Sequence, residues 1–277
     1  MNIPRLRDFT SARVGLARAG NSLPTSELLK LQLAHARARQ AVHSALDTPQ
    51  LALDLKNLGH HLVFVQSAVP DRATYLRRPD LGRNLNPESR DLLLSRDPAS
   101  PLGVLARKRA LTDQHDAVFV IADGLSALAV QRHAPNLLEA TLRLLDLKNW
   151  NLAPIVIVEQ GRVAIGDEIG ECLGAALAVV LIGERPGLSS ADSLGVYLTW
   201  NPHPGLTDAD RNCLSNIRQE GLAYPVAAAK LLFLMTESRR RKLSGIHLKE
   251  DFAGLTAAES QSGLHRPSPH TETTQIP

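Results

Sequence analysis

Short apolar, β-rich runs alternate with helical stretches after Gly59, and this alternation constrains the fold more than any other feature of the chain. Five runs are candidate strands: HLVFVQSA (61–68), AVFVIAD (117–123), APIVIVE (153–159), LAVVLIG (177–183) and LGVYLTW (194–200). Strands that are apolar throughout must be buried on both faces, and the helices that connect parallel strands supply that cover. The pattern therefore predicts an α/β fold with a mostly parallel sheet covered by helices.

Four segments are expected to be helices, over residues 25–47, 87–96, 126–147 and 225–242. The first mixes leucines with polar side chains and contains no proline. The second is opened by Asn86, a good N-cap, and by Pro87, which suits the first helical position. The last ends in Arg-Arg-Arg-Lys, and these charges complement the negative end of the helix macrodipole. We therefore interpret this basic run as a helix terminus rather than a polyanion site.

These elements divide the 277-residue chain into three parts. Residues 1–58 are expected to form an N-terminal helical arm, and residues 59–250 an α/β domain large enough to bury a sizeable core. Residues 251–277 lack apolar periodicity and are rich in Ser, Thr, Pro and His. Such a composition predicts a flexible tail.

Charge and composition argue against several classes of function. The 31 basic and 28 acidic side chains leave a net charge of +3, which gives no reason to expect a nucleic acid or a membrane as partner. The longest apolar run, 177–183, is too short to span a bilayer, and the N-terminal MNIPRLRDFT lacks the apolar core of a signal peptide. The 2 cysteines fit a reducing cytoplasm and are too few for a disulfide framework or a structural zinc site.

The segments that follow the strands are of interest because an open parallel sheet binds ligands beyond the carboxyl ends of its strands. DGLS at 123–126 leads into a helix, and taken alone it is interpreted as a turn whose serine is an N-cap. In GERPGL at 183–188, Pro186 and Gly187 suit the centre of a type II turn that presents Glu184 to a ligand. A surface ion pair between Glu184 and the arginine beside it is the alternative.

Residues 161–174, GRVAIGDEIGECLG, contain Gly166, Gly170 and Gly174 at intervals of four, which predicts a helix face that allows close packing. A phosphate-binding loop is rejected here, because acidic residues stand where Lys and Ser or Thr are needed. Cys213 lies in DRNCLSNI, interpreted as a polar segment between the last strand and the last helix, and its thiol is expected by default to be buried and inert. Neither a metal site nor a catalytic residue is predicted.

Six blocks resemble the small subunit of ethanolamine ammonia-lyase in order and spacing: RPDLGR (78–83), DGLS (123–126), GRV (161–163), IGE (169–171), GERPGL (183–188) and SNI (215–217). No single block is specific, but their shared order identifies the family over roughly residues 11–248. The resemblance implies that residues 59–250 form a Rossmann-like, cobalamin-binding domain. It also implies a hetero-oligomer, in which a large subunit holds ethanolamine and adenosylcobalamin lies between the two subunits.

The family positions that contact the cofactor fall on Val163, Glu184 and Cys213. By this resemblance, Val163 makes an apolar contact to the corrin or its lower base, and Glu184 accepts hydrogen bonds from the peripheral carboxamides. Cys213 makes a compact, polarizable contact and is not a cobalt ligand. The resemblance further implies a radical reaction that converts ethanolamine to acetaldehyde and ammonia, with this chain inactive alone. The implied location is the cytoplasm, and packaging in a bacterial microcompartment stays open.

Two other functions are compatible with the residues alone. The first is a Rossmann-like enzyme that binds a nucleotide and works by itself, but it needs a glycine fingerprint or a catalytic pair that the sequence lacks. The second is a pure interaction module, which would be independent of cobalamin. A gene for a large subunit beside this one would discriminate against the interaction module.

Overall fold

The computed structural model describes residues 13–95 and 115–248. Its centre is a six-stranded sheet with the strand order β1-β3-β2-β4-β5-β6. The strands are β1 (Leu62–Gln66), β2 (Val118–Ala122), β3 (Ile155–Glu159), β4 (Leu177–Gly183), β5 (Leu194–Trp200) and β6 (Arg211–Ile217). The first four of these pair in parallel, whereas β5 and β6 run antiparallel to their neighbours. The predicted mostly parallel sheet is confirmed, while the predicted 251–277 tail lies outside the described residues.

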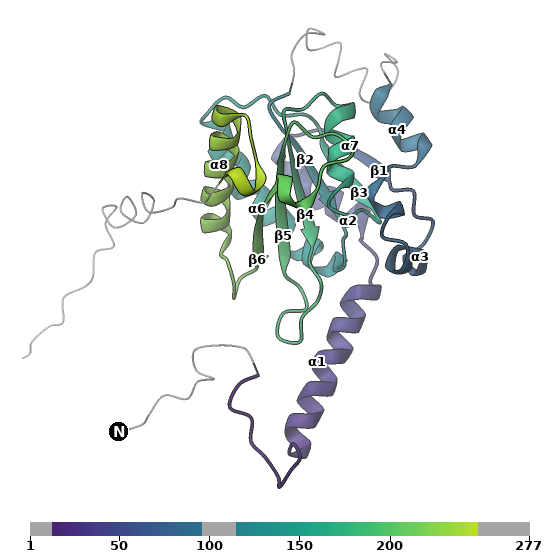
Figure 1. Ribbon diagram of the computed structural model, residues 1–277, viewed down its shortest axis with the longest axis vertical. Coiled ribbons are helices and arrows are strands. Elements are labelled where there is room, and N and C mark those ends of the chain that lie inside the picture. The colour runs from purple at the N-terminus through teal and green to yellow at the C-terminus, as the bar shows by residue number, and fades with distance from the viewer. Residues whose placement is uncertain (1–12, 96–114, 249–277) are drawn as a thin grey trace, which may run out of the picture.

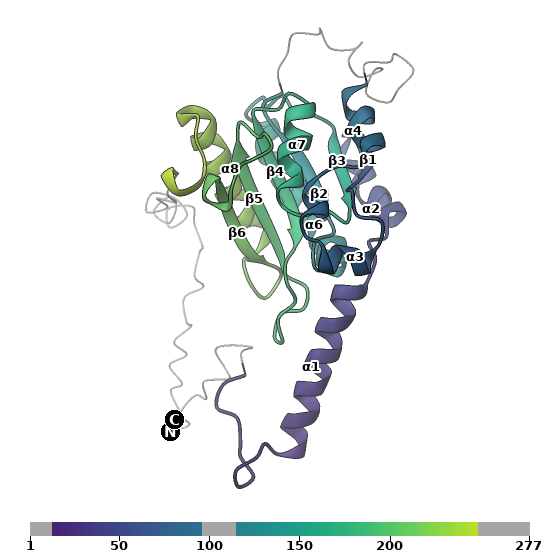
Figure 2. The same ribbon diagram turned by 45° about the vertical axis from the view of Figure 1, so that its right-hand side comes forward.

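The helices surround this sheet, with one exception. They are α1 (Thr25–His43), α2 (Thr48–Leu55), α3 (Arg72–Arg77), α4 (Pro87–Leu94), α6 (Ala127–Asp146), α7 (Ile165–Cys172) and α8 (Tyr224–Arg241). Short 3-10 turns add η2 (Lys56–Leu58), η3 (Leu81–Arg83), η4 (Asp208–Asp210) and η5 (Gly245–His247). The exception is α1, which projects away from the sheet (Figures 1 and 2). The predicted N-terminal helical segment is therefore confirmed.

Two predicted N-caps are confirmed by their hydrogen bonds. The Asn86 side chain accepts a hydrogen bond of 2.8 Å from the Ser89 N–H at the start of α4. The Ser126 hydroxyl accepts one of 3.3 Å from the Ala129 N–H at the start of α6. Both bonds satisfy backbone donors that the first turn of a helix leaves without a partner. The last predicted helix is also present, and α8 ends in its basic run at Arg241.

The core consists of two layers, one on each face of the sheet. On one face, the side chains of β2 and β4 at Phe119, Ile121, Val179 and Leu181 pack with residues of α2, α6 and α8. On the other face, the alternate positions pack against α7 and α4. Figure 1 shows α7 in front of the sheet and α6 behind it. Burial on both faces explains why these strands are apolar at every position.

β6 corrects one prediction. The segment around Cys213 is not a polar loop but the edge strand of the sheet, paired with β5. Residues 211–215 alternate between the two faces, so that Leu214 is buried while Cys213 and Ser215 are exposed. An edge strand covered on one face only needs few apolar residues, which is why its sequence is largely polar.

The glycines of 161–174 correct a second prediction, that all three allow close packing. Gly166 and Gly170 allow close packing, since a Cβ would lie 2.3 Å from Val180 Cγ2 in the first case and 2.4 Å from Pro202 Cγ in the second. Gly174, by contrast, has no atom within 4 Å of such a Cβ and adopts a φ of +63° beyond the end of the helix. The third glycine therefore allows the left-handed conformation that follows many helices rather than close packing.

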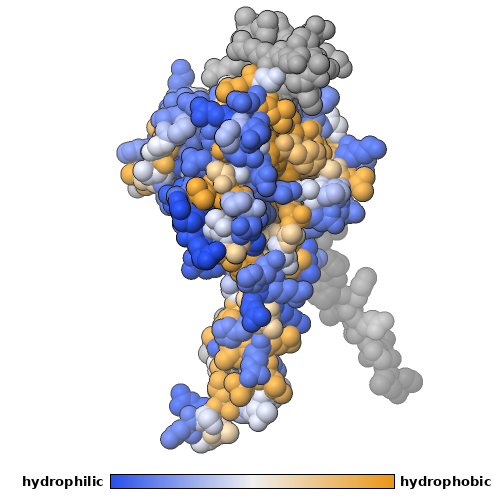
Figure 3. Space-filling model, turned by 90° about the vertical axis from the view of Figure 1, so that its right-hand side faces the viewer, coloured by the Kyte–Doolittle hydropathy of each residue, from blue (hydrophilic) through white to orange (hydrophobic). Residues whose placement is uncertain are grey.

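The projecting helix carries exposed apolar side chains. Leu28, Leu29 and Leu33 of α1 are 44%, 59% and 51% exposed. Figure 3 shows apolar surface along this helix. Within the described ranges, no helix is both long and apolar enough to cross a membrane.

Candidate functional site

The loop after β3, which carries Val163, is fixed to the loop after β2 by a buried carboxylate. Asp123 Oδ1 accepts hydrogen bonds from the N–H groups of Gly124 (2.9 Å) and Gly161 (3.1 Å). Asp123 Oδ2 lies 3.4 Å from Arg72 Nη1. Burial raises the pKa of Asp123 to about 6, although Arg72 and the N–H donors act in the opposite direction. Asp123 is therefore a buried structural group that joins the loops after β2 and β3.

A stack of side chains fixes the same loop from the other side. The Arg162 guanidinium lies 4.0 Å from the centre of the Tyr75 ring, and the Arg72 guanidinium lies 4.6 Å from it. The Tyr75 hydroxyl donates to the Gly161 carbonyl at 3.0 Å, and burial raises the pKa of this phenol, so it stays a donor. Cation–π contacts and a buried hydrogen bond thus fix Gly161 and Arg162, and Val163 is the next residue of the chain.

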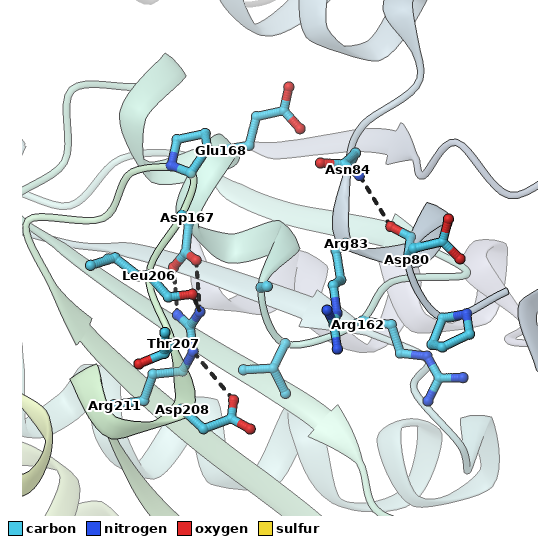
Figure 4. A pocket seen from close by; sticks show the side chains of 15 residues that line it. Asp80, Arg83, Asn84, Arg162, Asp167, Glu168, Leu206, Thr207, Asp208 and Arg211 are labelled. Carbon is cyan, nitrogen blue, oxygen red and sulfur yellow. Dashed lines mark hydrogen bonds and ion pairs between the residues drawn. The ribbon is translucent and has the colours of Figure 1, made fainter.

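Val163 lines a cavity of about 670 Å³ that lies beside the N-terminus of α7 (Figure 4). Three loops that are distant in sequence form its walls: the η3 loop, the β3–α7 loop and the loop before η4. The polar side chains that line it belong to Asp80, Arg83, Asn84, Arg162, Asp167, Glu168, Thr207, Asp208 and Arg211. The cavity therefore combines the predicted apolar contact at Val163 with a strongly polar wall.

A buried ion pair joins one wall of this cavity to the edge strand. Arg211, the first residue of β6, donates to both carboxylate oxygens of Asp167 on α7, at 2.6 and 2.8 Å. The two side chains are only 2% and 3% exposed. Arg211 also donates to the Thr199 hydroxyl at 3.1 Å and to the Leu206 carbonyl at 3.1 Å. The pair fixes β6, α7 and the loop before η4 relative to one another.

Glu184 lies just beyond the end of β4 and is half-buried. Its Oε1 accepts a hydrogen bond of 2.5 Å from the Ser215 hydroxyl, and its Oε2 accepts one of 3.1 Å from the Asn216 N–H. The carboxylate is therefore bound to β6, which disfavours the alternative of a surface ion pair with Arg185. Each oxygen retains capacity for a further donor.

The predicted type II turn after Glu184 is wrong. Gly187 does not have the positive φ that such a turn requires at its third residue. Instead, Gly187 and Ser190 exchange two backbone hydrogen bonds, of 2.7 and 3.3 Å. The turn is therefore centred further along the chain than the Pro-Gly pair indicated.

Cys213 is exposed, so the default expectation of a buried thiol is wrong. In the ladder of the sheet it pairs with Tyr197 of β5, which in turn pairs with Val180 of β4. Gly166 of α7 packs on Val180, whereas Cys213 lies two strands further out on the same face. Burial raises the pKa of Tyr197, and the neighbouring Cys213 and Glu184 raise it further. The thiol is thus on the part of the sheet that α7 leaves uncovered.

The three predicted residues lie on one face of the sheet. Arg211, Cys213 and Ser215 occupy alternate positions of β6 and therefore point to the same face. Arg211 lines the cavity together with Val163, and Ser215 binds Glu184. Cys213 lies between Arg211 and Ser215 on this face.

The sequence did not identify the polar residues of the cavity. Arg83 belongs to the RPDLGR block, and nothing in that block by itself indicates a role for the arginine. Its neighbour Arg162 belongs to the GRV block, in which only Val163 was assigned a role, and Asp208 comes from a segment with no motif of its own. Among the described residues, no group of three or more His, Cys, Asp or Glu side chains is placed to hold a metal ion.

Comparison with known proteins identifies the family. The model of the family "Ethanolamine ammonia-lyase light chain (EutC)" matches residues 2–249. The ethanolamine ammonia-lyase small subunit of Azotobacter vinelandii is 54% identical over 94% of this chain and 93% of its own length. Those of Pseudomonas fluorescens (strain Pf0-1) and Ralstonia nicotianae are 51% and 53% identical, over 93% and 88% of this chain and 90% and 87% of theirs. The chain therefore belongs to the ethanolamine ammonia-lyase light chain family.

Proposed function

We propose that this protein is the small subunit of an adenosylcobalamin-dependent ethanolamine ammonia-lyase, and that it completes the cobalamin site at the interface with the large subunit. The complex converts ethanolamine to acetaldehyde and ammonia by a radical mechanism. The observation that carries the proposal is the match to the family over residues 2–249, with relatives named as small subunits at 51–54% identity.

The residues on the uncovered face fit cobalamin. A corrin is broad and apolar and carries carboxamides around its rim, so it needs an open surface with hydrogen-bond acceptors at fixed positions. Glu184 supplies such an acceptor, because Ser215 and Asn216 hold both of its oxygens in place. Val163 supplies apolar surface and Cys213 an exposed, polarizable sulfur.

In our proposal this chain binds and orients the cofactor, and it contributes no catalytic residue. When bound, adenosylcobalamin supplies the radical chemistry through its cobalt–carbon bond. Val163, Glu184 and Cys213 fix the position of the cofactor on this chain, while the large subunit holds ethanolamine. The chain alone is therefore inactive.

We propose that the large subunit covers two surfaces that this chain leaves exposed. One is the face of β5 and β6 beyond α7, and the other is α1 with its exposed leucines. This assignment agrees with a division into an arm (1–58), a cobalamin-binding domain (59–250) and a tail (251–277). We place the complex in the cytoplasm.

Replacement of Glu184 by alanine is expected to weaken cobalamin binding by the complex roughly tenfold, the effect of losing one charge-assisted acceptor. The measurement is a spectroscopic titration of the co-purified complex with cyanocobalamin. Glu184→Gln keeps one neutral acceptor oxygen, so its dissociation constant should lie between those of the wild-type and alanine proteins. Glu139→Ala, on α6 at the opposite face, is the control and should change nothing. An unchanged dissociation constant for Glu184→Ala would remove Glu184 from the site.

A further inference from the structure

The cavity beside α7 contains an arginine whose charge is not neutralised. Arg83 is the last residue of η3, and Figure 4 shows its side chain reaching into the space between Arg162 and the group around Arg211. No carboxylate in the part of the chain that the structure describes forms an ion pair with it. Arg83 is an exposed residue that lines this cavity, and its guanidinium is free to bind an anionic group there.

Other groups occupy most of the carboxylates near Arg83. Asp80 accepts hydrogen bonds from the Arg78 fork, at 2.9 and 2.6 Å. Glu168 accepts from the Leu85 N–H at 2.8 Å and lies 3.4 Å from Arg90 Nη1. Asp167 is held by Arg211. The remaining acidic residue of the lining, Asp208, is exposed on the other wall, 3.9 Å from Arg211 Nε.

The backbone that carries Arg83 is anchored on both sides. Before it, the Gly82 carbonyl accepts a hydrogen bond of 2.7 Å from the Arg162 N–H. The chains approach so closely that a Cβ on Gly82 would lie 2.8 Å from Arg162 Cγ, which explains the glycine of the RPDLGR block. After it, the Asn84 side chain donates to the Asp80 carbonyl at 3.1 Å, and Leu85 is bound to Glu168. Arg83 is thus presented from a fixed loop.

A second cation lies on the same wall. Arg162 donates to the Tyr75 carbonyl at 3.0 Å and stacks on the Tyr75 ring, but it too forms no ion pair within the described residues. Its Nε is buried without a hydrogen-bond partner. Two arginines therefore make this wall positive, next to the N-terminus of α7, where the helix dipole also favours an anion.

The size and position of the cavity indicate which anionic group it binds. A volume of about 670 Å³ holds a ligand of drug size but is too small for a whole cobalamin. The cavity adjoins Val163, one of the proposed cobalamin contacts. Cobalamin carries a single anionic side group, the phosphodiester of its nucleotide loop, since its corrin side chains are amides. A guanidinium fork matches phosphate oxygens in geometry and charge.

We propose that Arg83 binds the phosphodiester of the cobalamin nucleotide loop inside this cavity, with Arg162 contributing the second positive charge. The proposal rests on the proposed function, because it requires cobalamin on this face of the sheet. It gives the RPDLGR block a role in cofactor binding, with Gly82 shaping the loop and Arg83 contacting the ligand.

The test compares two ligands on the co-purified complex with the large subunit. Cyanocobalamin carries the nucleotide loop, whereas dicyanocobinamide has the same corrin without the phosphodiester and its nucleotide. For Arg83→Gln, the dissociation constant of cyanocobalamin should rise roughly 10- to 100-fold, while that of dicyanocobinamide should not change. Arg83→Lys should recover part of the loss, since it keeps the charge without the fork. Arg77→Gln, an exposed arginine of α3, is the charge-matched control and should affect neither ligand.

Each other outcome overturns the assignment. Equal weakening of both ligands would place Arg83 against the corrin, and no weakening would remove it from the site. Failure of the Arg83→Gln chain to co-purify with the large subunit would show that Arg83 binds a carboxylate of the partner instead. A wild-type complex that binds neither ligand would overturn the proposed function itself, and that result is distinct from a loss confined to Arg83.

Discussion

Arg211→Met is expected to lower the free energy of unfolding of the full chain by about 3–5 kcal/mol, the usual consequence of removing one partner from a buried ion pair. Asp167 would remain only 3% exposed with no cation to balance it. The Thr199 hydroxyl and the Leu206 carbonyl would lose their bonds to Arg211 as well. Methionine has a similar length, so the loss comes from the charge and the hydrogen bonds rather than from a large void.

The measurement is urea-induced unfolding followed by circular dichroism. Arg240→Met is the matched control, because Arg240 pairs with Glu237 on the surface of α8 and is 67% exposed. Its effect should be below about 1 kcal/mol. The double variant Arg211→Met with Asp167→Leu should recover most of the loss, since it leaves no unpaired charge. A single variant as stable as the wild type would show that the pair does not join β6 to α7.

Gly183→Ala is expected to destabilise the chain by about 3 kcal/mol, at the upper end of what overpacking costs. A Cβ at this position would lie 2.0 Å from the Ser126 carbonyl oxygen and 2.7 Å from that of Asp123. These are backbone atoms and cannot rotate away as a side chain would. The ends of β4 and β2 would have to separate, which would also displace Glu184, the next residue.

Gly187→Ala is the control for Gly183, in the segment that follows the same strand. The nearest atom to its Cβ would be the Ser190 carbonyl oxygen at 3.5 Å, and no positive φ is involved. In thermal unfolding, the melting temperature of Gly187→Ala should therefore be close to that of the wild type, and the melting temperature of Gly183→Ala should be well below it. Equal melting temperatures for the two variants would contradict the close contact between the loops after β2 and β4.

The fold could be predicted largely because its inner strands are apolar at every position. β2 and β4 are buried on both faces, and short runs of this kind are typical of the central strands of a parallel sheet. β6 was missed for the opposite reason. Only Leu214 and Ile217 of its C-terminal half face the core, and residues such as Ser215 are exposed, so the run does not look like a strand. Local sequence also did not determine the turn after Glu184, which is closed by backbone hydrogen bonds between Gly187 and Ser190 rather than around the Pro-Gly pair.

The candidate site could be predicted only in part. Val163, Glu184 and Cys213 came from the family resemblance, and each lies in a different loop or strand. What joins them is the alternation of β6, which the sequence did not reveal. The cavity was missed because Arg83, Arg162 and Arg211 meet only in the folded chain. Their charges look ordinary in sequence, and only the pairing of Arg211 with Asp167 distinguishes the buried arginine from the others.

The most direct test of the proposed function is ammonia release from ethanolamine in the presence of adenosylcobalamin. Three samples are compared: this chain alone, the cognate large subunit alone, and the two co-expressed. We expect release only from the co-expressed pair, because this chain supplies cofactor contacts and no catalytic residue. Release by this chain alone would contradict the proposed role, and a soluble, co-purifying complex with no activity would exclude ethanolamine as its substrate.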